Sequence, residues 1–575
     1  MEPIKEMIEQ EWLRHEIIGR NDMFKTPVGE RPLVYADYTA SGRGLYFIEN
    51  YLQDLLRYYA NSHTDDDFTG KTMTCLLHEA EERIKKIVNA GATGKIVFTG
   101  TGATGAIMRL QQILGVFWPP ATKNRLEGMI DSCSLIEEVK SPCRTSLRKQ
   151  MDKNKPIVFV GPYEHHSNEI MWRQSLCEVI EVPLNSAGEL DLDDLSAMVS
   201  DPKYDHREKI GSFSAASNVS GIKTPIYEVA RILHRHGAIA CFDFAACAPY
   251  VEIDMNRDEE AYFDAIFLSP HKFLGGPGAS GLLVFNEKIY NKTLPPSVAA
   301  GGTVDFVTYD SQKFSDDIET REKPGTPGIL QAIKTSLVFQ LKDKIGIDTI
   351  EKIEHYLFSQ FIERFGEDKR IEFYGSTDPD KKVNIIAFNV KHGNRLVHPR
   401  LFTRIMNDFF GIQTRAGCSC AGPYGHRLLC IDKVLSSRFV HLVEDRGLNG
   451  MKPGWVRLNL HYSFSADEFD YICNALDYLI EKAFRFIPLY EFDIKSGEWQ
   501  YKDAVDDRIT LDFDQVLNAQ PPWKRSSPSL NLLFEEAVYD AERILEKAEK
   551  DPEYHKFDRE VEEIIFFQSL KVRDK

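Results

Sequence analysis

The feature that most constrains the fold is a series of short apolar runs that alternate with helical patterns between about residues 31 and 300. Four of these runs are IVFT (96–99), IVFVG (157–161), AIACFDF (238–244) and AIFLS (265–269). Each is almost continuously apolar and is followed by glycine, proline or polar residues, which is typical of strands buried on both faces of a parallel sheet. The sequence therefore predicts an α/β fold with a mostly parallel central sheet flanked by helices.

The domain organisation follows from where this alternation stops. A chain of 575 residues is long enough for two or more cored domains. We expect an N-terminal arm at 1–30, a large domain at 31–325, a smaller α+β domain at 326–487 and a C-terminal extension at 488–575.

The two C-terminal regions have recognisable elements of their own. In the small domain we expect helices at 326–346 and 466–484, with strands at 384–390 and 455–464. The extension predicts a hairpin at 492–503, a linker at 521–529 (PPWKRSSPS) and an amphipathic helix at 530–550.

Composition limits the class of protein. A net charge of −17 argues against nucleic acid or an anionic membrane as a general partner. No apolar run approaches the roughly 20 residues that span a bilayer, and the charged N-terminus has no signal-peptide pattern. The ten cysteines form no small-domain disulfide framework and no paired C-x-x-C pattern, so we expect a reduced, cytoplasmic protein without a metal site.

A glycine-rich loop follows the first of the four apolar runs. The string GTGATG (100–105) precedes a helical pattern, an arrangement that lets backbone N–H groups bind a phosphate. It also satisfies the G-x-G-x-x-G pattern of dinucleotide-binding proteins. That pattern requires an acidic residue at the end of a second strand about 20 residues on, and PPATKNRLEGMIDS is not a strand, which counts against an NAD enzyme.

Three further predicted strand ends carry polar residues. They are His165 and His166 after the second run, Asp243 inside the third, and SPHK (269–272) after the fourth. Ligands bind at the carboxyl ends of parallel strands, so these residues should converge. A lysine amine, a carboxylate for a pyridine nitrogen, phosphate donors and a ring for stacking are the groups that pyridoxal phosphate requires.

With these residues on the page, the motifs YADYTASGRG, TGTGATGAI, EHHSN, SNVSG, SPHK, GTPG and RAGCSCA are recognisable together. The chain resembles the class V aminotransferase and cysteine desulfurase family of fold-type I pyridoxal phosphate enzymes, from about Tyr35 to about residue 487. The resemblance implies that Lys272 forms the Schiff base, that Asp243 pairs with the pyridine nitrogen and that His165 stacks on the ring. It implies a phosphate-binding set of Gly102, Ala103, Thr104, Ser269 and His271.

The same resemblance implies how the substrate and a second subunit bind. Asn218 would lie near the cofactor's phenolic oxygen and the substrate carboxylate. Arg457 would bind that α-carboxylate bidentately, with Arg415 as a further substrate-binding residue. Thr326 would reach the phosphate of a partner subunit, which implies a homodimer. The family commonly has glutamine where this chain has Ala246, so one donor to the phenolic oxygen is missing.

The cysteines bear on the type of reaction. By resemblance, Cys420 aligns with the thiol that takes sulfur from L-cysteine as a persulfide and leaves alanine, and a sulfur-acceptor protein would then be a partner. Such a thiol needs exposure and a lowered pKa, which the nearby Arg415 and His426 suit. A relay with Cys418, or a metal site of Cys418, Cys420 and His426, is an alternative use of these residues.

Other functions remain open from the sequence. The two cysteines could be packing residues in an aminotransferase or an epimerase-like enzyme that acts at the amino-acid α-carbon. The extension could belong to a scaffold protein that only keeps the fold, but the intact set of Lys272, Asp243 and His165 favours an enzyme.

Overall fold

The computed structural model describes residues 10–62, 64, 66–131, 153–504, 512–513, 529–548 and 554–569. The chain divides into two compact units. Unit 1 comprises Met1–Phe47, Asn218–Gly221 and Asp348–Lys575, and unit 2 comprises Ile48–Ser217 and Ile222–Ile347.

Unit 2 is built on a seven-stranded sheet. In sheet order the strands are β4 (Gly94–Gly100), β10 (Gly281–Asn286), β9 (Ala265–Leu268), β8 (Ile239–Asp243), β7 (Lys209–Ser214), β5 (Ile157–Val160) and β6 (Glu178–Glu181). Strand β10 is antiparallel to both of its neighbours, and β9, β8, β7, β5 and β6 pair in parallel. The predicted α/β fold with a mostly parallel sheet is confirmed.

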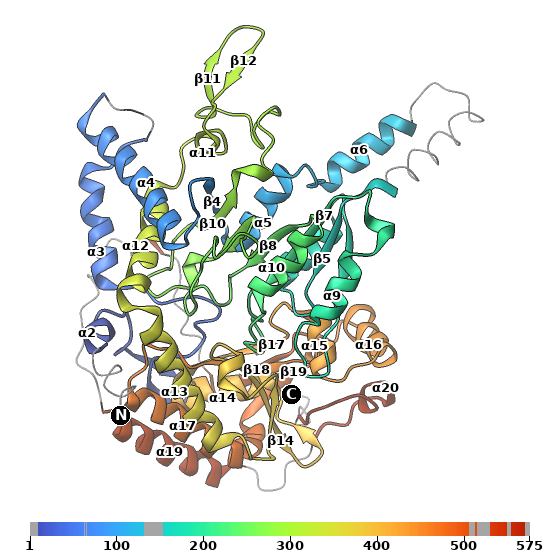
Figure 1. Ribbon diagram of the computed structural model, residues 1–575. Coiled ribbons are helices and arrows are strands. Elements are labelled where there is room, and N and C mark those ends of the chain that lie inside the picture. Colours follow the sequence, from blue (N-terminus) through green and yellow to red (C-terminus); the bar gives the residue numbers. More distant parts are fainter. Residues whose placement is uncertain are drawn as a thin grey trace. The chain divides into compact units, whose positions relative to one another are not determined.

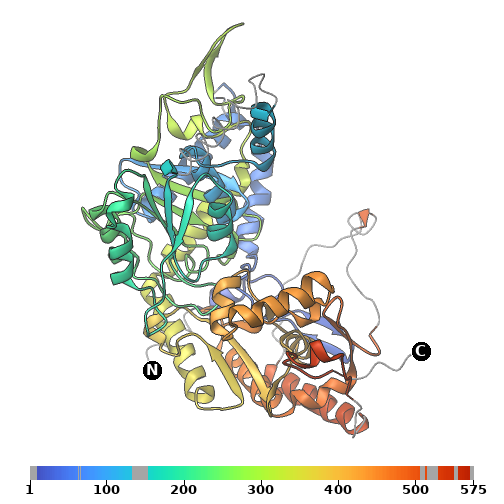
Figure 2. The same cartoon turned by 90° about the vertical axis from the view of Figure 1, so that its right-hand side faces the viewer.

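Helices cover both sides of this sheet (Figure 1 and Figure 2). The helices of unit 2 are α4 (Phe68–Ile87), α5 (Gly102–Ile113), α6 (Pro120–Asp131), α8 (His166–Arg173), α9 (Leu192–Val199), α10 (Ile226–Arg235), α11 (Ile318–Arg321) and α12 (Ile329–Ile345). Helix α6 is mostly exposed and extends away from the sheet, and α3 (Tyr46–Leu55) spans the boundary between the units in the sequence. A two-stranded hairpin of β11 (Val304–Val307) and β12 (Gln312–Phe314) extends away from the sheet in both views.

The continuous apolar runs account for the core of unit 2. Every residue of β5, β7 and β9 is buried, because these strands are covered on both faces. One face packs against α5 through Ile107 and Leu110, which are fully buried, as the helical spacing in the sequence predicts.

Unit 1 contains a five-stranded antiparallel sheet and several small pairs of strands. The sheet order is β13 (Ile371–Tyr374), β14 (Ile385–His392), β18 (Trp455–Asn459) and β17 (Arg415–Gly417), with β15 (Arg395–Leu396) paired to β14. The pairs are β1 (Met23–Thr26) with β2 (Gly29–Pro32), β3 (Val34–Tyr35) with β16 (Ile412–Gln413), and β19 (Tyr490–Asp493) with β20 (Glu498–Tyr501).

The helices of unit 1 include two long neighbours, α17 and α19 (Figure 1). The set is α2 (Glu11–Arg14), α13 (Ile347–Phe365), α14 (Pro399–Phe410), α15 (Gly422–Leu428), α16 (Lys433–Val440), α17 (Ala466–Lys482), α19 (Leu530–Lys547) and α20 (Arg559–Glu562). No helix in the described ranges is long and apolar enough to cross a membrane.

The boundaries of these units differ from the expected domains. The helix expected to open the small domain, now α12, belongs to unit 2 and packs on α4. The described residues 10–47 belong to unit 1 and not to a separate arm or to the large domain. Residues 1–9 of the expected arm, and 521–528 of the expected linker, lie outside the described residues.

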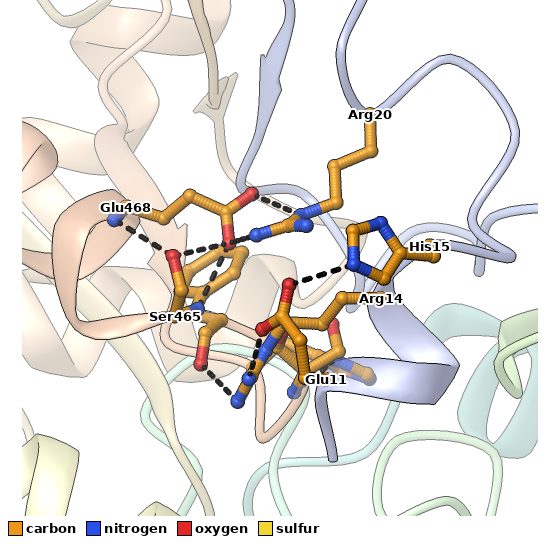
Figure 3. A network of polar contacts seen from close by, with 9 residues as sticks. Glu11, Arg14, His15, Arg20, Ser465 and Glu468 are labelled. Atoms are coloured by element: carbon orange, nitrogen blue, oxygen red, sulfur yellow. Dashed lines mark hydrogen bonds and ion pairs between the residues drawn. The ribbon is translucent and has the colours of Figure 1, made fainter. Parts of the chain in front are cut away.

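Ion pairs and a hydrogen bond to a backbone carbonyl join the N-terminal residues to the rest of unit 1. Arg20 binds Glu468 through two bonds of 2.9 Å (Figure 3). Arg14 donates to the carbonyl of Ser463 at 2.9 Å and pairs with Glu11. Glu468 also completes a capping box with Ser465 at the start of α17. The bonds from Arg20 to Glu468 and from Arg14 to Ser463 join residues more than 400 positions apart, so the local pattern of the sequence could not show them.

The C-terminal extension is part of the same unit. The predicted hairpin and helix are present as β19–β20 and α19. Helix α19 is joined to α17 by a hydrogen bond of 2.7 Å from Tyr478 to Glu542, and to the N-terminal region by an ion pair of 3.0 Å between Arg31 and Asp540.

Candidate functional site

The predicted site residues form two sets, one in each unit. Unit 2 carries the residues expected to bind the cofactor, namely Gly102, Ala103, Thr104, His165, Asp243, Ser269, His271, Lys272 and Thr326. Unit 1 carries Asn218, Arg415 and Arg457, which are expected to bind the substrate, Asn218 being expected near the cofactor as well. It also carries Cys420, the expected sulfur-accepting thiol, and the neighbouring Cys418.

The glycine-rich loop forms the start of α5 beside the end of β9. The backbone N–H of Ala103 donates to the Ser269 hydroxyl at 2.9 Å, and the Thr104 hydroxyl lies 2.7 Å from that of Ser167. Gly102 has a φ of +61°, and a Cβ there would lie 2.8 Å from the Ser269 hydroxyl and 3.6 Å from Nε2 of His271. Glycine is therefore required, and the residues expected to bind a phosphate are brought together.

Lys272 ends a short 3₁₀ helix (Pro270–Lys272) directly after β9. Burial, together with the Lys272 charge, lowers the pKa of His271 to about 4, so its imidazole is neutral near pH 7. A neutral ring has one N–H donor and one acceptor, which suits contact with a phosphate oxygen.

Asp243 is the last residue of β8 and is only 4% exposed. Its Oδ1 accepts a hydrogen bond of 2.8 Å from the N–H of Ala245. Burial raises the pKa of Asp243, while that hydrogen bond and the Lys272 charge act in the opposite direction. A nearby cation stabilises the ionised form of a buried carboxylate, and a protonated pyridine nitrogen is such a cation.

His165 caps the N-terminus of α8, and its ring is held in place. Its Nδ1 accepts a hydrogen bond of 3.2 Å from the N–H of Ser167. Because Nδ1 is the acceptor, the ring proton of a neutral imidazole lies on Nε2. The half-buried ring has the fixed orientation that stacking on a flat cofactor needs.

Arg457 is the central cation of the second set. It is 4% exposed on β18, its Nη2 forms an ion pair of 2.8 Å with Asp37, and its Nη1 donates to the carbonyl of Asn218 at 3.2 Å. Its buried Nε has no hydrogen-bond partner within the described ranges, and neither has Oδ1 of Asn218. An unsatisfied guanidinium N–H beside an amide oxygen is a suitable site for the carboxylate and amine of an amino acid.

Arg415 reinforces this positive charge. It lies directly opposite Arg457 in the antiparallel pair β17–β18, so both side chains leave the same face of the sheet. Asp37 was not predicted as a site residue. Its only signal in the sequence is a carboxylate two positions after the strand residue Tyr35, in YADY.

The cysteine loop is a strained turn. Ser419 and Cys420 have φ angles of +51° and +57°, as the two central residues of a type I′ turn do, and the N–H of Ala421 donates to the carbonyl of Cys418 at 3.2 Å. Such conformations are unusual for non-glycine residues and cluster at functional sites. Both cysteine thiols are exposed.

His426 does not take part in this turn through its ring. Its Nδ1 lies 2.8 Å from the carbonyl of Gly422, and its Nε2 lies 3.0 Å from the hydroxyl of Ser436. In the part of the chain that the structure describes, no group of three or more histidines, cysteines or carboxylates could hold a metal ion.

Two remaining positions are placed by the structure. Thr326 is exposed in the loop before α12, and its role toward a partner subunit stays a prediction. Ala246, where the family commonly has glutamine, is buried beside Cys247, whose pKa burial raises to about 12.

The chain is similar to known proteins over most of its length. The family model for class V aminotransferases matches residues 143–439. A probable cysteine desulfurase of Halalkalibacterium halodurans is 30% identical over 71% of this chain and 89% of its own length. A probable cysteine desulfurase of Staphylococcus aureus is 28% identical over 72% of this chain and 90% of its own length.

Solved structures show the same fold. A cysteine desulfurase from Thermococcus onnurineus superposes with a TM-score of 0.60 at 21% identity, over 78% of this chain and 95% of that one. A cysteine desulfurase from Escherichia coli gives a TM-score of 0.57 at 17% identity, over 78% and 94%.

Proposed function

We propose, since this chain belongs to the class V aminotransferase family, that it is a pyridoxal 5′-phosphate-dependent cysteine desulfurase that converts L-cysteine to alanine and leaves a persulfide on Cys420. One observation supports desulfurase activity in particular, and not only membership of the family. The side chain of Asn218 donates to the carbonyl of Ser419 at 2.6 Å, and the carbonyl of Asn218 accepts from Arg457. A single residue thus joins the thiol-bearing turn to the carboxylate-binding cation.

The residues of unit 2 fit pyridoxal phosphate. The start of α5, Ser269 and His271 would hold the phosphate, Asp243 the pyridine nitrogen, His165 the ring face and Lys272 the aldehyde carbon. When bound, this cofactor withdraws electrons from the substrate α-carbon and so activates the bonds around it.

The chain's own residues then account for the sulfur transfer. Arg457 binds the α-carboxylate, and the Lys272 amine can take up the proton that leaves the α-carbon. The Cys420 thiolate attacks the substrate sulfur, so an S–S bond forms as the substrate C–S bond breaks. The carbon that carried the sulfur keeps the electron pair of the broken C–S bond and takes up one proton, and the α-carbon regains its proton from Lys272. The product leaves as alanine, and the enzyme keeps the sulfur as Cys420 persulfide.

The test measures both products. Purified protein loaded with pyridoxal phosphate is incubated with L-cysteine and a thiol reductant, and alanine and sulfide are quantified together. We expect equal amounts, with Cys420→Ser reduced by at least about a hundredfold and Cys418→Ser, the neighbouring exposed thiol, close to wild type. Transamination or epimerisation without sulfide would instead assign the protein to the other reaction at the α-carbon.

Lys272 is tested independently of the reaction. Borohydride reduction of the loaded protein should fix the cofactor mass on the peptide that contains Lys272, and Lys272→Ala should carry none. Label on another lysine would contradict the assignment.

Three further properties belong to the proposal. The exposed thiols of Cys75, Cys418, Cys420 and Cys430 are unpaired, which favours the reducing cytoplasm. The exposed position of Cys420 suits transfer of sulfur to an acceptor protein. A homodimer is proposed from the exposed Thr326 loop, and light scattering of the purified protein measures it.

A further inference from the structure

Glu164 is a buried carboxylate next to His165 to which the proposed reaction assigns no role. It is only 4% exposed. Its Oε1 accepts from the N–H of Gly161 at 3.1 Å and from the N–H of Ser214 at 2.8 Å. Its Oε2 accepts from the Ser214 hydroxyl at 2.6 Å and from Nδ2 of Asn168 at 2.7 Å. The carboxylate is the acceptor in all four of these hydrogen bonds.

These donors come from three elements around the expected ring site. Gly161 follows β5, Ser214 ends β7, and Asn168 lies in α8, which His165 caps. The backbone leaves room for the carboxylate, because a Cβ on Gly161 would lie 2.5 Å from Oε1 of Glu164. The glycine at the end of the IVFVG run is therefore explained by the glutamate three residues later.

The network also reaches the strand that carries Asp243. Ser214 and Asp243 are directly paired in the parallel ladder of β7 and β8, and the N–H of Ala215 donates to the carbonyl of Asp243 at 2.8 Å. Burial raises the pKa of Glu164 to about 7, hydrogen bonds from Ser214 and Asn168 oppose this, and the charge of Asp243 adds to it. The two carboxyl groups therefore interact electrostatically.

We propose that Glu164 is a positioning residue for the cofactor. It fixes His165 on one face of the cofactor ring, and it fixes the ends of β7 and β8 so that Asp243 lies at the ring nitrogen. The proposal rests on the proposed function, because it requires that pyridoxal phosphate binds in unit 2. Glu164 does not touch the reacting atoms. It acts through the segment 161–168 and through Ser214.

A general packing role makes a different prediction, and α8 offers a control. Glu169 is also buried, at 5% exposed, and pairs with Arg173 on the same helix, outside the Glu164 network. Glu164→Gln keeps the size of the side chain but replaces one accepting oxygen by an NH₂ group, which faces a donor. Glu169→Gln makes the same chemical change elsewhere on α8.

The experiment separates cofactor binding from stability. Full-length apo-protein of each variant is titrated with pyridoxal phosphate, the visible absorption of the bound cofactor gives Kd and band position, and thermal unfolding gives Tm. We expect Glu164→Gln to bind about tenfold more weakly, equivalent to about 1.4 kcal/mol, with a shifted absorption band. Glu169→Gln should lower Tm while leaving Kd and the band unchanged.

Ser214→Ala gives a second variant in case Glu164→Gln does not fold. It removes the hydroxyl donor and keeps the backbone N–H at position 214. We therefore expect a smaller loss of affinity for pyridoxal phosphate, about threefold. Unchanged Kd and absorption in both Glu164→Gln and Ser214→Ala, or equal losses in Glu169→Gln, would overturn the positioning role. Failure of the wild-type protein to bind the cofactor would instead refute the proposed function.

Discussion

Replacement of Lys382 by methionine should stabilise this protein at neutral pH. Lys382 in unit 1 is 7% exposed, and its ammonium lies 4.5 Å from the centre of the Phe358 ring. Within the described ranges it forms no ion pair, and burial lowers its pKa from 10.5 to about 7. The folded state therefore holds a poorly solvated cation, which a methionine of similar length would remove.

The size of the effect follows from the pKa. At about 1.4 kcal/mol per pH unit, a fall from 10.5 to about 7 destabilises the charged folded form by up to about 5 kcal/mol. The contact with the Phe358 ring offsets about 1–2 kcal/mol of this. We expect Lys382→Met to raise the free energy of unfolding by about 3 kcal/mol at pH 6.5.

The sign of the pH dependence distinguishes this from a packing effect. Between about pH 7 and 10.5 the unfolded lysine is protonated and the folded one is not, so wild-type stability rises with pH from this group. The advantage of Lys382→Met should therefore shrink to below about 1 kcal/mol at pH 10.

Urea unfolding followed by circular dichroism at pH 6.5 and pH 10 measures the difference. Lys381→Met, at the exposed neighbouring position, is the control and should change stability by less than about 0.5 kcal/mol. A gain that does not depend on pH, or a loss at pH 6.5, would refute the reasoning.

Three other outcomes are expected. Arg457→Lys should raise the KM for L-cysteine about a hundredfold, with kcat changed less, because one ammonium cannot bind both Asp37 and a carboxylate bidentately; an unchanged KM in steady-state assays would exclude Arg457 from substrate binding. Asp264→Asn should lower stability by about 2 kcal/mol at pH 7. Burial alone would raise the pKa of Asp264, but its bonds with His234 and Lys288 hold that pKa below the usual value. The difference in stability between wild type and Asp264→Asn should therefore disappear as the pH falls below about 4. A difference that persists at that pH in urea titrations would contradict this. Leu545→Ala, buried at 5% in α19, should lower Tm by several degrees while Leu532→Ala, 62% exposed, should not; equal shifts in thermal scans would mean that α19 does not pack as described.

Much of unit 2 could be predicted from the sequence because its determinants are local. The runs that became β5 and β9 are continuously apolar, and the residues after them carry the expected polar groups. The antiparallel direction of β10 was not predicted, since an apolar run such as GLLVFN does not encode its direction. Direction is decided by the connection and by the neighbouring strands.

The contacts that complete the candidate site are long-range, and these were missed. Asp37 pairs with Arg457 across more than 400 positions of the chain. The turn at Ser419 and Cys420 has no glycine at its positive φ angles, so composition alone does not reveal it. Glu164 stands beside a histidine that the sequence singles out, but its four donors are visible only once β5, β7 and α8 have come together.

Asn218 is bonded both to Ser419 in the cysteine turn and to Arg457, and this affects the order of events in a catalytic cycle. A turn that carries sulfur away must release the bond between the Ser419 carbonyl and the Asn218 amide. That release leaves the amide unsatisfied beside Arg457 unless another acceptor replaces the carbonyl, and a bound carboxylate is such an acceptor. Occupancy by an amino acid would then favour the released turn, so that the thiol becomes mobile when there is sulfur to collect and is held when there is none.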